Sequence, residues 1–369
     1  MYVNTAGKER QSNFELLRIV LMITIPVYHL MLYNGVFYMD YHKNVVPGLF
    51  LSSGGAITAD YAFIALTAYF LLESKKKPVI RRLLVFLAQV ATLYLIRFVV
   101  IRGLWGFDSG NWFVEDYILG GAWWFVTPYM ILLLTYPLLN RLYEAISEKA
   151  HGLLCILLGI WFLVNGITLC MNLLNDLVAF LFTYTVMAFL RRHDYRRWFL
   201  KTQKWQMLIL YLAGFLLTFL VSWYVKLPGV LASDEVANEV VKHLIGKYTP
   251  LQFIMGLAVF FLFRDLTVPQ SKTINTLARS VFFVFLLHET VMGVYWYFGW
   301  INGQYSYYST SSFWLWLGIY VCSCLLVGFA VQQIYDRFLA PLWLRLIDWV
   351  CARPWMERIE ERIWREKDM

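Results

Sequence analysis

Residues 13–30 read NFELLRIVLMITIPVYHL, an apolar run that carries Glu15, Arg18 and His29. Ionisable side chains are costly in the hydrocarbon core of a membrane, so such residues inside an apolar helix indicate a functional site. Arg18 and His29 are eleven residues apart, which is about three helical turns, so both side chains project from one face. Pro26 lies one turn before His29 and lacks a backbone donor, which predicts a bend.

The whole chain has the composition of an integral membrane protein. Of its 369 residues, 60% are hydrophobic and 15% are charged, and the mean hydropathy is +0.57. Soluble domains have roughly 45–50% apolar and about 25% charged residues. Aromatic residues make up 18% of the chain, which is typical of belts at two membrane interfaces together with an aromatic interior. The net charge of +8 is explained by short basic loops and does not indicate a nucleic-acid partner.

The apolar segments predict an all-α, polytopic integral membrane protein with about ten transmembrane helices. A spanning helix needs about 20 mainly apolar residues, within a range of roughly 17–25. The eighth segment is short, and we expect it to extend at either end. The ten segments are Phe14–Tyr33, Gly54–Leu72, Leu83–Ile101, Ala122–Leu139, Gly152–Cys170, Leu173–Leu190, Met207–Val225, Leu251–Phe263, Val281–Trp300 and Phe313–Ile334.

Basic loops alternate along the chain with loops that hold few basic residues. Cytoplasmic loops carry the excess of Lys and Arg, so the basic loops and both termini are predicted to be cytoplasmic. Residues 1–335 form the transmembrane domain in this interpretation, and residues 336–369 form a cytoplasmic tail. Several Trp side chains lie among Arg and Glu residues in that tail. They favour an amphipathic helix on the inner leaflet, and a solvated charged tail is the alternative.

Three ionisable residues from three predicted helices fall at similar depth. At about 1.5 Å per residue, Arg18 lies near the cytoplasmic surface and His29 lies in the outer half of the membrane. The second segment runs inward and the third runs outward, which places Asp60 and Arg97 in the outer half as well. We expect His29, Asp60 and Arg97 to face one polar cavity, with Asp60 orienting His29 or pairing with Arg97. The alternative is that each residue pairs or snorkels separately.

The first two segments also resemble a known family. The start Asn-Phe-Glu-Leu-Leu-Arg, followed eleven residues after Arg18 by His29, resembles the membrane acyltransferase-3 family. Its members are polytopic, acyl-CoA-dependent transferases that modify surface sugars and related acceptors. Residues 67–71 read TAYFL, which is similar to the family's Ser-Gly-Tyr-Phe-Leu. Thr67 and Ala68 stand here in place of Ser and Gly.

Two later stretches carry the resemblance further. Residues 122–129, AWWFVTPY, are similar to the family's Trp-Trp-Phe/Tyr stretch. Residues 279–288, RSVFFVFLLH, are similar to its Lys/Arg-Ser-Thr-Phe-Gly-Val-Tyr-Leu-Ile-His segment, with Phe283 in place of the usual Gly. The candidate substrate-binding residues are Trp123, Trp124, Tyr129, His288 and Glu289. For each Trp, a place in the interfacial belt is the alternative, and a turn of about 100° per residue separates Glu289 from His288 on the helix.

The resemblance implies an acyltransferase that takes an acyl-CoA, expected to be acetyl-CoA, as co-substrate and uses no metal. The cofactor-binding candidates for the phosphates of coenzyme A are Arg18, Lys75, Lys76, Arg81 and Arg82, which can form charge-assisted pairs. A role in topology alone is the alternative for this basic cluster. The expected acceptor is a hydroxyl of a cell-surface glycan or a lipid-linked sugar, and the expected location is the bacterial plasma membrane.

The predicted catalytic residues are His29, Asp60 and Arg97. A neutral imidazole can take a proton from the attacking hydroxyl or accept the acyl group itself, and the sequence leaves both routes open. Arg97 is a candidate for stabilising the oxyanion of the thioester.

Two other functions fit the same features. A transporter or flippase for a polysaccharide precursor would also use intramembrane charges and an interrupted helix. A non-catalytic family member that acts as a membrane partner would fit the changed residues at Thr67 and Ala68.

Overall fold

The computed structural model describes residues 11–33, 44–74, 79–105, 123–168, 173–193, 204–297 and 311–364. Over these ranges the chain forms helices joined by turns, without a β-strand, which confirms the all-α prediction. The helices are α1 (Ser12–Tyr33), α2 (Val45–Ser53), α3 (Ala56–Leu72), α4 (Val79–Trp105), α6 (Val126–Ala145), α7 (Glu148–Thr168), α8 (Leu173–Arg192), α10 (Lys204–Lys226), α11 (Asp234–Ile245), α12 (Pro250–Arg264), α13 (Lys272–Leu277), the 3-10 turn η1 (Ala278–Ser280), α14 (Val281–Tyr297), α15 (Phe313–Ile334), the π-helical turn η2 (Tyr335–Leu339), α16 (Ala340–Cys351) and α17 (Pro354–Trp364).

Eight stretches of the described chain are long and apolar enough to cross a membrane. They are Ser12–Leu32, Val45–Leu72, Val79–Val100, Glu148–Gly166, Lys204–Lys226, Asp234–Arg264, Lys272–Met292 and Phe313–Cys351. Each of the ten predicted segments overlaps a helix, but α6 and α8, with 20 residues each, are not among the eight. The short eighth segment is extended at its N-terminal side, since α11 and α12 together form one of the eight stretches. The total of about ten spans stays a prediction.

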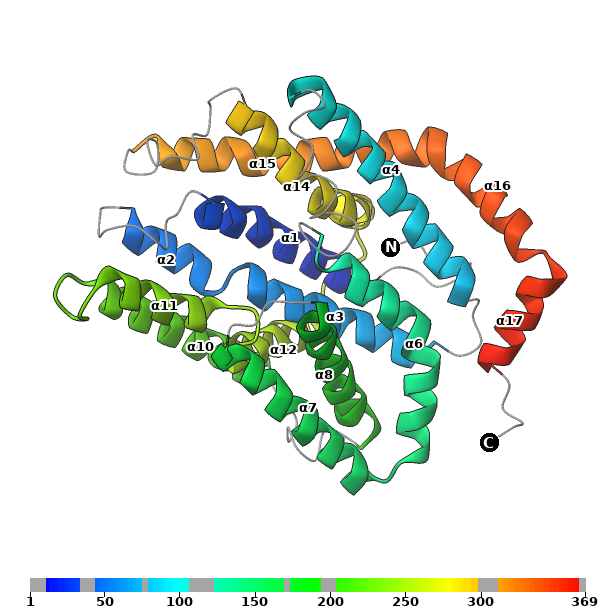
Figure 1. Cartoon of the computed structure of the whole chain (residues 1–369), viewed down its shortest axis with the longest axis horizontal. Helices are drawn as coiled ribbons and strands as arrows, with labels where there is room; N and C mark the ends of the chain where they lie inside the picture. Colours follow the sequence, from blue (N-terminus) through cyan, green and yellow to red (C-terminus); the bar gives the residue numbers. More distant parts are fainter. Residues whose placement is uncertain are drawn as a thin grey trace.

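Helices α1 and α3 lie at the centre of the bundle (Figure 1). α1 contacts α3, α12, α14 and α15, while α3 also contacts α6 and α8. Leu17 and Met31 from α1 and Ala62 and Ala65 from α3 are fully buried. α1 remains one helix through Pro26. The helix that carries the ionisable residues is therefore surrounded by protein on several sides.

Several helix ends that carry basic residues gather at one end of the bundle, called the basic end here. The ring of Phe14 at the start of α1 lies 5.3 Å from that of Tyr69 near the end of α3. Arg191 at the end of α8 donates to the carbonyl of Tyr69 at 2.7 Å. Asn13 donates to the carbonyl of Arg264, the last residue of α12, at 3.1 Å. This grouping agrees with the alternation of basic loops, and the assignment of the basic end to the cytoplasm stays a prediction.

The described residues after α15 form η2, α16 and α17 with a short turn before α17, and α16 packs against α4 (Figure 1). Trp343 of α16 donates from its indole nitrogen to the Thr92 hydroxyl of α4 at 3.0 Å. Ile347 is buried, whereas Leu342 and Trp349 are 60% and 59% exposed. α16 therefore has one face on the bundle and one apolar face directed outward. Its placement on the inner leaflet as part of a separate tail stays a prediction.

Helices α14 and α15 approach each other closely at Gly328. A Cβ atom on Gly328 would overlap Cγ2 of Val284 and would lie 2.8 Å from the backbone nitrogen of that residue. Small residues allow helix backbones in membrane proteins to pack at such short range. The position of α14 therefore depends on residue 328 being a glycine, which has no side chain.

We expect Gly328→Ala to lower the melting temperature, because the added methyl group must push α14 and α15 apart. Overpacking of this kind costs typically 1–3 kcal/mol, more than the roughly 1 kcal/mol that Ala gains over Gly in a helix. Gly318→Ala is the matched control, since it lies on the same helix and a Cβ atom there would have no neighbour within 4 Å. Thermal unfolding in detergent, followed by size-exclusion chromatography, measures both variants. Equal melting temperatures would contradict the close crossing.

Candidate functional site

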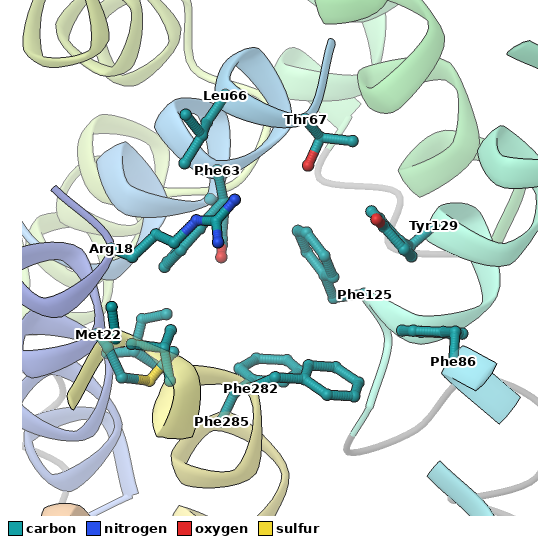
Figure 2. A pocket seen from close by; sticks show the side chains of 14 residues that line it. Arg18, Met22, Phe63, Leu66, Thr67, Phe86, Phe125, Tyr129, Phe282 and Phe285 are labelled. Carbon is teal, nitrogen blue, oxygen red and sulfur yellow. The ribbon is translucent and has the colours of Figure 1, made fainter. Parts of the chain in front are cut away.

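A cavity lies between α1, α3, α4, α6 and α14. Its walls are mainly aromatic and aliphatic, and the space between them, counted out to the open mouth, is about 680 Å³. In Figure 2, Arg18 reaches in from one side, and Phe125 and Tyr129 face it from the other. The lining residues are Arg18, Met22, Ile25, Asp60, Phe63, Leu66, Thr67, Phe86, Phe125, Tyr129, Ala278, Val281, Phe282 and Phe285.

Arg18 is the cationic group of this cavity and lies toward the basic end. Its guanidinium is 3.4 Å from the carboxylate of Glu15, one turn earlier on α1, and its side chain is 20% exposed. Thr67 also lines the cavity, so the hydroxyl of the usual Ser is kept at this position. Ala68 is fully buried elsewhere in the core. The predicted contacts Arg18 and Tyr129 thus share one cavity.

His29 and His288 meet one helical turn beyond the cavity residues Ile25 and Phe285. Nδ1 of His29 lies 2.5 Å from Nε2 of His288, the ring planes differ by 17°, and the ring centroids are 4.8 Å apart. Stacked rings stay about 3.5–4.0 Å apart because their atoms repel at closer range. Nearly parallel rings with a 2.5 Å nitrogen contact must therefore meet edge to edge. This is hydrogen-bond geometry within the ring planes.

Arg97 pairs with Glu289 of α14. The guanidinium and carboxylate are 3.4 Å apart, and the two side chains are only 3% and 7% exposed. Arg97 also lies 5.7 Å from the ring centroid of Trp123. We expected Asp60 either to orient His29 or to pair with Arg97; α4 instead packs against α14, which brings Glu289 to Arg97. The indole nitrogen of Trp123 donates to the carbonyl of Leu286 at 3.2 Å, so Trp123 supports the same pair.

Asp60 borders both the large cavity and a second, smaller space lined by Trp124, Asp176 and Lys247. Lys247 lies 3.3 Å from the carboxylate of Asp176, and its ammonium is 3.6 Å from the ring centroid of Trp124. Lys247 is close enough to act electrostatically on both Asp60 and His29. Asp60 therefore faces a lysine instead of the predicted arginine.

Sequence reasoning missed Lys247. It lies between α11 and α12, inside the apolar stretch Asp234–Arg264. A lysine within such a stretch is the signal that could have marked it. The hydroxyl of Tyr61, the neighbour of Asp60, donates to the carbonyl of Lys247. This bond ties the junction between α11 and α12 to α3, where Asp60 lies.

Arg81 and Arg82, two of the remaining predicted phosphate contacts, do not line the described cavity. The other two, Lys75 and Lys76, lie outside the described residues. Arg82 donates to the hydroxyl of Tyr136 at 3.1 Å, and Arg81 pairs with α16 through a carboxylate 2.8 Å away. Arg18 is thus the predicted phosphate contact that the structure places at the cavity.

His29, His288 and Glu289 could together reach one metal ion. Their potential ligand atoms all lie within 4.8 Å of one another. Two nitrogens bound to one tetrahedral zinc at about 2.0–2.1 Å would be roughly 3.3 Å apart, whereas these two are 2.5 Å apart. Glu289 also holds Arg97. A metal would require the imidazole rings to separate, so the present geometry is that of a hydrogen-bonded pair.

A family model described as an acyltransferase domain, that of the acyltransferase-3 family, matches residues 11–332. The chain belongs to the acyltransferase-3 family. No curated protein and no solved structure matches it. The matched region runs from the start of α1 into α15, so it contains the cavity, both histidines and the Arg97–Glu289 pair. With its eight apolar stretches, this acyltransferase-3 protein is a multi-pass membrane acyltransferase.

We expect Arg97→Met and Glu289→Leu each to destabilise the protein by about 3–5 kcal/mol, because each leaves the opposite charge buried without this partner. The double variant should be more stable than the sum of the two single effects allows. Melting temperatures in detergent measure the cycle. Arg81→Met is the control, because its partner Asp348 is 57% exposed and such pairs contribute about 1 kcal/mol or less. Strictly additive effects of Arg97→Met and Glu289→Leu would contradict the buried pair.

Proposed function

We propose that this protein is a membrane O-acyltransferase that moves an acyl group, in the first instance acetyl, from a coenzyme A thioester to a hydroxyl of a cell-surface glycan or lipid-linked sugar. One observation carries the proposal: the His29–His288 pair lies one turn beyond an aromatic cavity that holds Arg18 toward its other end. The acyltransferase domain over residues 11–332 supports the reaction class.

The donor would lie along α1. Arg18 and His29 are eleven residues apart, or about 16 Å at 1.5 Å per residue. A phosphate held by Arg18 through charge-assisted bonds would let an extended pantetheine arm run through the cavity toward His29. The hydroxyls of Thr67 and Tyr129 can bond the amides of that arm, and the aromatic walls can pack against its methylene groups.

His29 would act as general base. The acceptor hydroxyl oxygen attacks the thioester carbon while its proton passes to the imidazole, and the carbon–sulfur bond then breaks. The imidazolium returns the proton to the departing thiolate, so acyl ester and free thiol are the products. Transfer of the acyl group first to His29 itself is the alternative route. Asp60 and Arg97 keep their proposed catalytic roles, with Arg97 available to stabilise the oxyanion.

The acceptor would approach from the side of Lys247, Asp176 and Trp124. Their polar atoms can bond sugar hydroxyls near Asp60 and His29. The ammonium of Lys247 covers one face of the Trp124 ring, so a sugar that stacks on that face would have to displace the lysine. In the bacterial plasma membrane, with the basic end cytoplasmic, this side would face outward, where glycan acceptors are found.

Transport of a polysaccharide precursor is less well supported. Intramembrane charges suit a transporter as well as an enzyme, but membership of an acyltransferase family favours acyl transfer. The same family membership is compatible with a non-catalytic partner, which turnover measurements separate from the enzyme.

We expect His29→Ala to lower acyl transfer at least about 100-fold, because a general base contributes roughly 10²–10⁴-fold. Purified protein in liposomes with radiolabelled acetyl-CoA measures thioester hydrolysis and transfer. His243→Ala is the control, because this histidine of α11 is exposed and its Nδ1 bonds the carbonyl of Glu239 on the same helix at 2.7 Å. A wild-type protein that neither binds coenzyme A nor turns over any acyl-CoA would contradict the proposed function.

We expect Arg18→Gln to raise the KM for acyl-CoA about 10- to 100-fold with a smaller change in kcat. Hydrogen bonds to charged groups contribute about 1.5–3 kcal/mol, and loss of ground-state binding appears in KM. Steady-state kinetics with acetyl-CoA measure both constants. Arg264→Gln is the control, because Arg264 also lies at the basic end but pairs with Asp265 at 2.6 Å and does not line the cavity. An unchanged KM for Arg18→Gln would contradict the donor path.

A further inference from the structure

The hydrogen bonds of His288 fix where its own proton lies. Nδ1 of His288 is 2.5 Å from the carbonyl oxygen of Phe285. A carbonyl oxygen only accepts, so Nδ1 must carry the hydrogen. His288 is fully buried, and burial favours the neutral ring, which carries a single N–H. Nε2 of His288 is therefore an acceptor.

This acceptor faces Nδ1 of His29. The two nitrogens are 2.5 Å apart and the rings lie nearly in one plane. Since Nε2 of His288 has the lone pair, Nδ1 of His29 must donate its hydrogen. In the neutral form of His29 the lone pair then lies on Nε2, at the other edge of the ring.

We propose that His288 is a positioning residue that selects the tautomer of His29, so that Nε2 of His29 is the nitrogen that takes the acceptor proton. This inference rests on the proposed function, in which His29 is the general base. His288 acts through His29 and does not itself touch the reacting atoms. In other catalytic sites a carboxylate orients the histidine by accepting its hydrogen bond. Here the neutral imidazole of His288 accepts the hydrogen bond of His29 instead.

The surroundings hold His288 in this orientation. The hydroxyl of Tyr320 on α15 donates to the backbone carbonyl of His288 at 3.2 Å. The carboxylate of the adjacent Glu289 lies 3.4 Å from the guanidinium of Arg97. When His29 gains a proton, its bond to Nε2 of His288 becomes charge-assisted and therefore stronger. The pair thus favours the intermediate in which His29 is charged.

Two substitutions at His288 distinguish the effect of its hydrogen-bond acceptor, Nε2, from the effect of its side-chain volume. The oxygen of Gln can lie near the position of Nε2 and accept from His29. Asn is one bond shorter, so it can still donate to the Phe285 carbonyl but leaves His29 no acceptor. We expect His288→Asn to lower kcat at least tenfold with an unchanged KM for acetyl-CoA, by analogy with groups that orient a catalytic or metal-bound histidine. His288→Gln should retain most of the wild-type kcat.

Equal kcat values for His288→Asn and His288→Gln, at matched melting temperatures and with an active, His29-dependent wild type, would overturn the inference. That result would leave the acyltransferase proposal intact. An inactive wild type would instead count against the proposed function, and the tautomer would still be decided by a second measurement that does not depend on turnover.

That measurement is nitrogen NMR of the protein with ¹⁵N-labelled histidine, with His29→Ala to assign the signal. We expect His29 to carry its hydrogen on Nδ1 in the wild type and in His288→Gln, and to gain the other tautomer in His288→Asn. A wild-type His29 protonated on Nε2 would overturn the inference. So would stoichiometric zinc in the purified protein that is lost in His29→Ala, because a bound ion would replace the hydrogen bond between the rings.

Discussion

The structure depends on one constraint, which is that an ionisable side chain among apolar helices needs a polar partner. Arg97 of α4 meets Glu289 of α14, and Lys247 meets Asp176 of α8. His29 of α1 contacts His288 of α14. The first and third contacts tie α4 and α1 to α14, and the second ties the junction before α12 to α8. Charge pairing therefore sets which helices are neighbours as well as how the site is built.

Helix α14 serves two of these contacts with two successive residues. A helix turns by about 100° per residue, so His288 and Glu289 point in different directions from one short segment. His288 reaches α1 and Glu289 reaches α4. At Gly328, α15 packs closely against α14 at Val284, about one turn before His288. The hydroxyl of Tyr320 on α15 donates to the backbone carbonyl of His288. The orientation of the histidine pair is thus a consequence of how α14 is packed.

Periodicity and spacing were enough to predict the helices but not the cavity: of His29, Asp60 and Arg97, which we expected to face one polar cavity, Asp60 lines the large cavity described above. The same patterns also marked His29, Asp60, Arg97, His288 and Glu289 as the unusual polar residues of the interior. The partners were not predictable in the same way. Hydropathy and loop charge predict how deep each residue lies in the membrane, but they do not say which helix lies beside which. Asp60 and Arg97 are close in depth and come from consecutive predicted segments, yet α4 packs against α14. Lys247 was missed because it lies in a junction and not in a helix.

A neutral histidine has a physical advantage over a carboxylate as the partner of His29. A carboxylate in that place would add a second buried negative charge beside the Arg97–Glu289 pair, and burying an uncompensated charge is expensive. With His288 the neighbouring pairs Arg97–Glu289 and Lys247–Asp176 each sum to zero, and the two imidazoles add no charge at rest. A single charge then develops at His29 when it takes a proton. An apolar cavity can hold the neutral thioester arm of the donor beside such a site. The electric field at the reacting atoms then changes when His29 begins to take the proton.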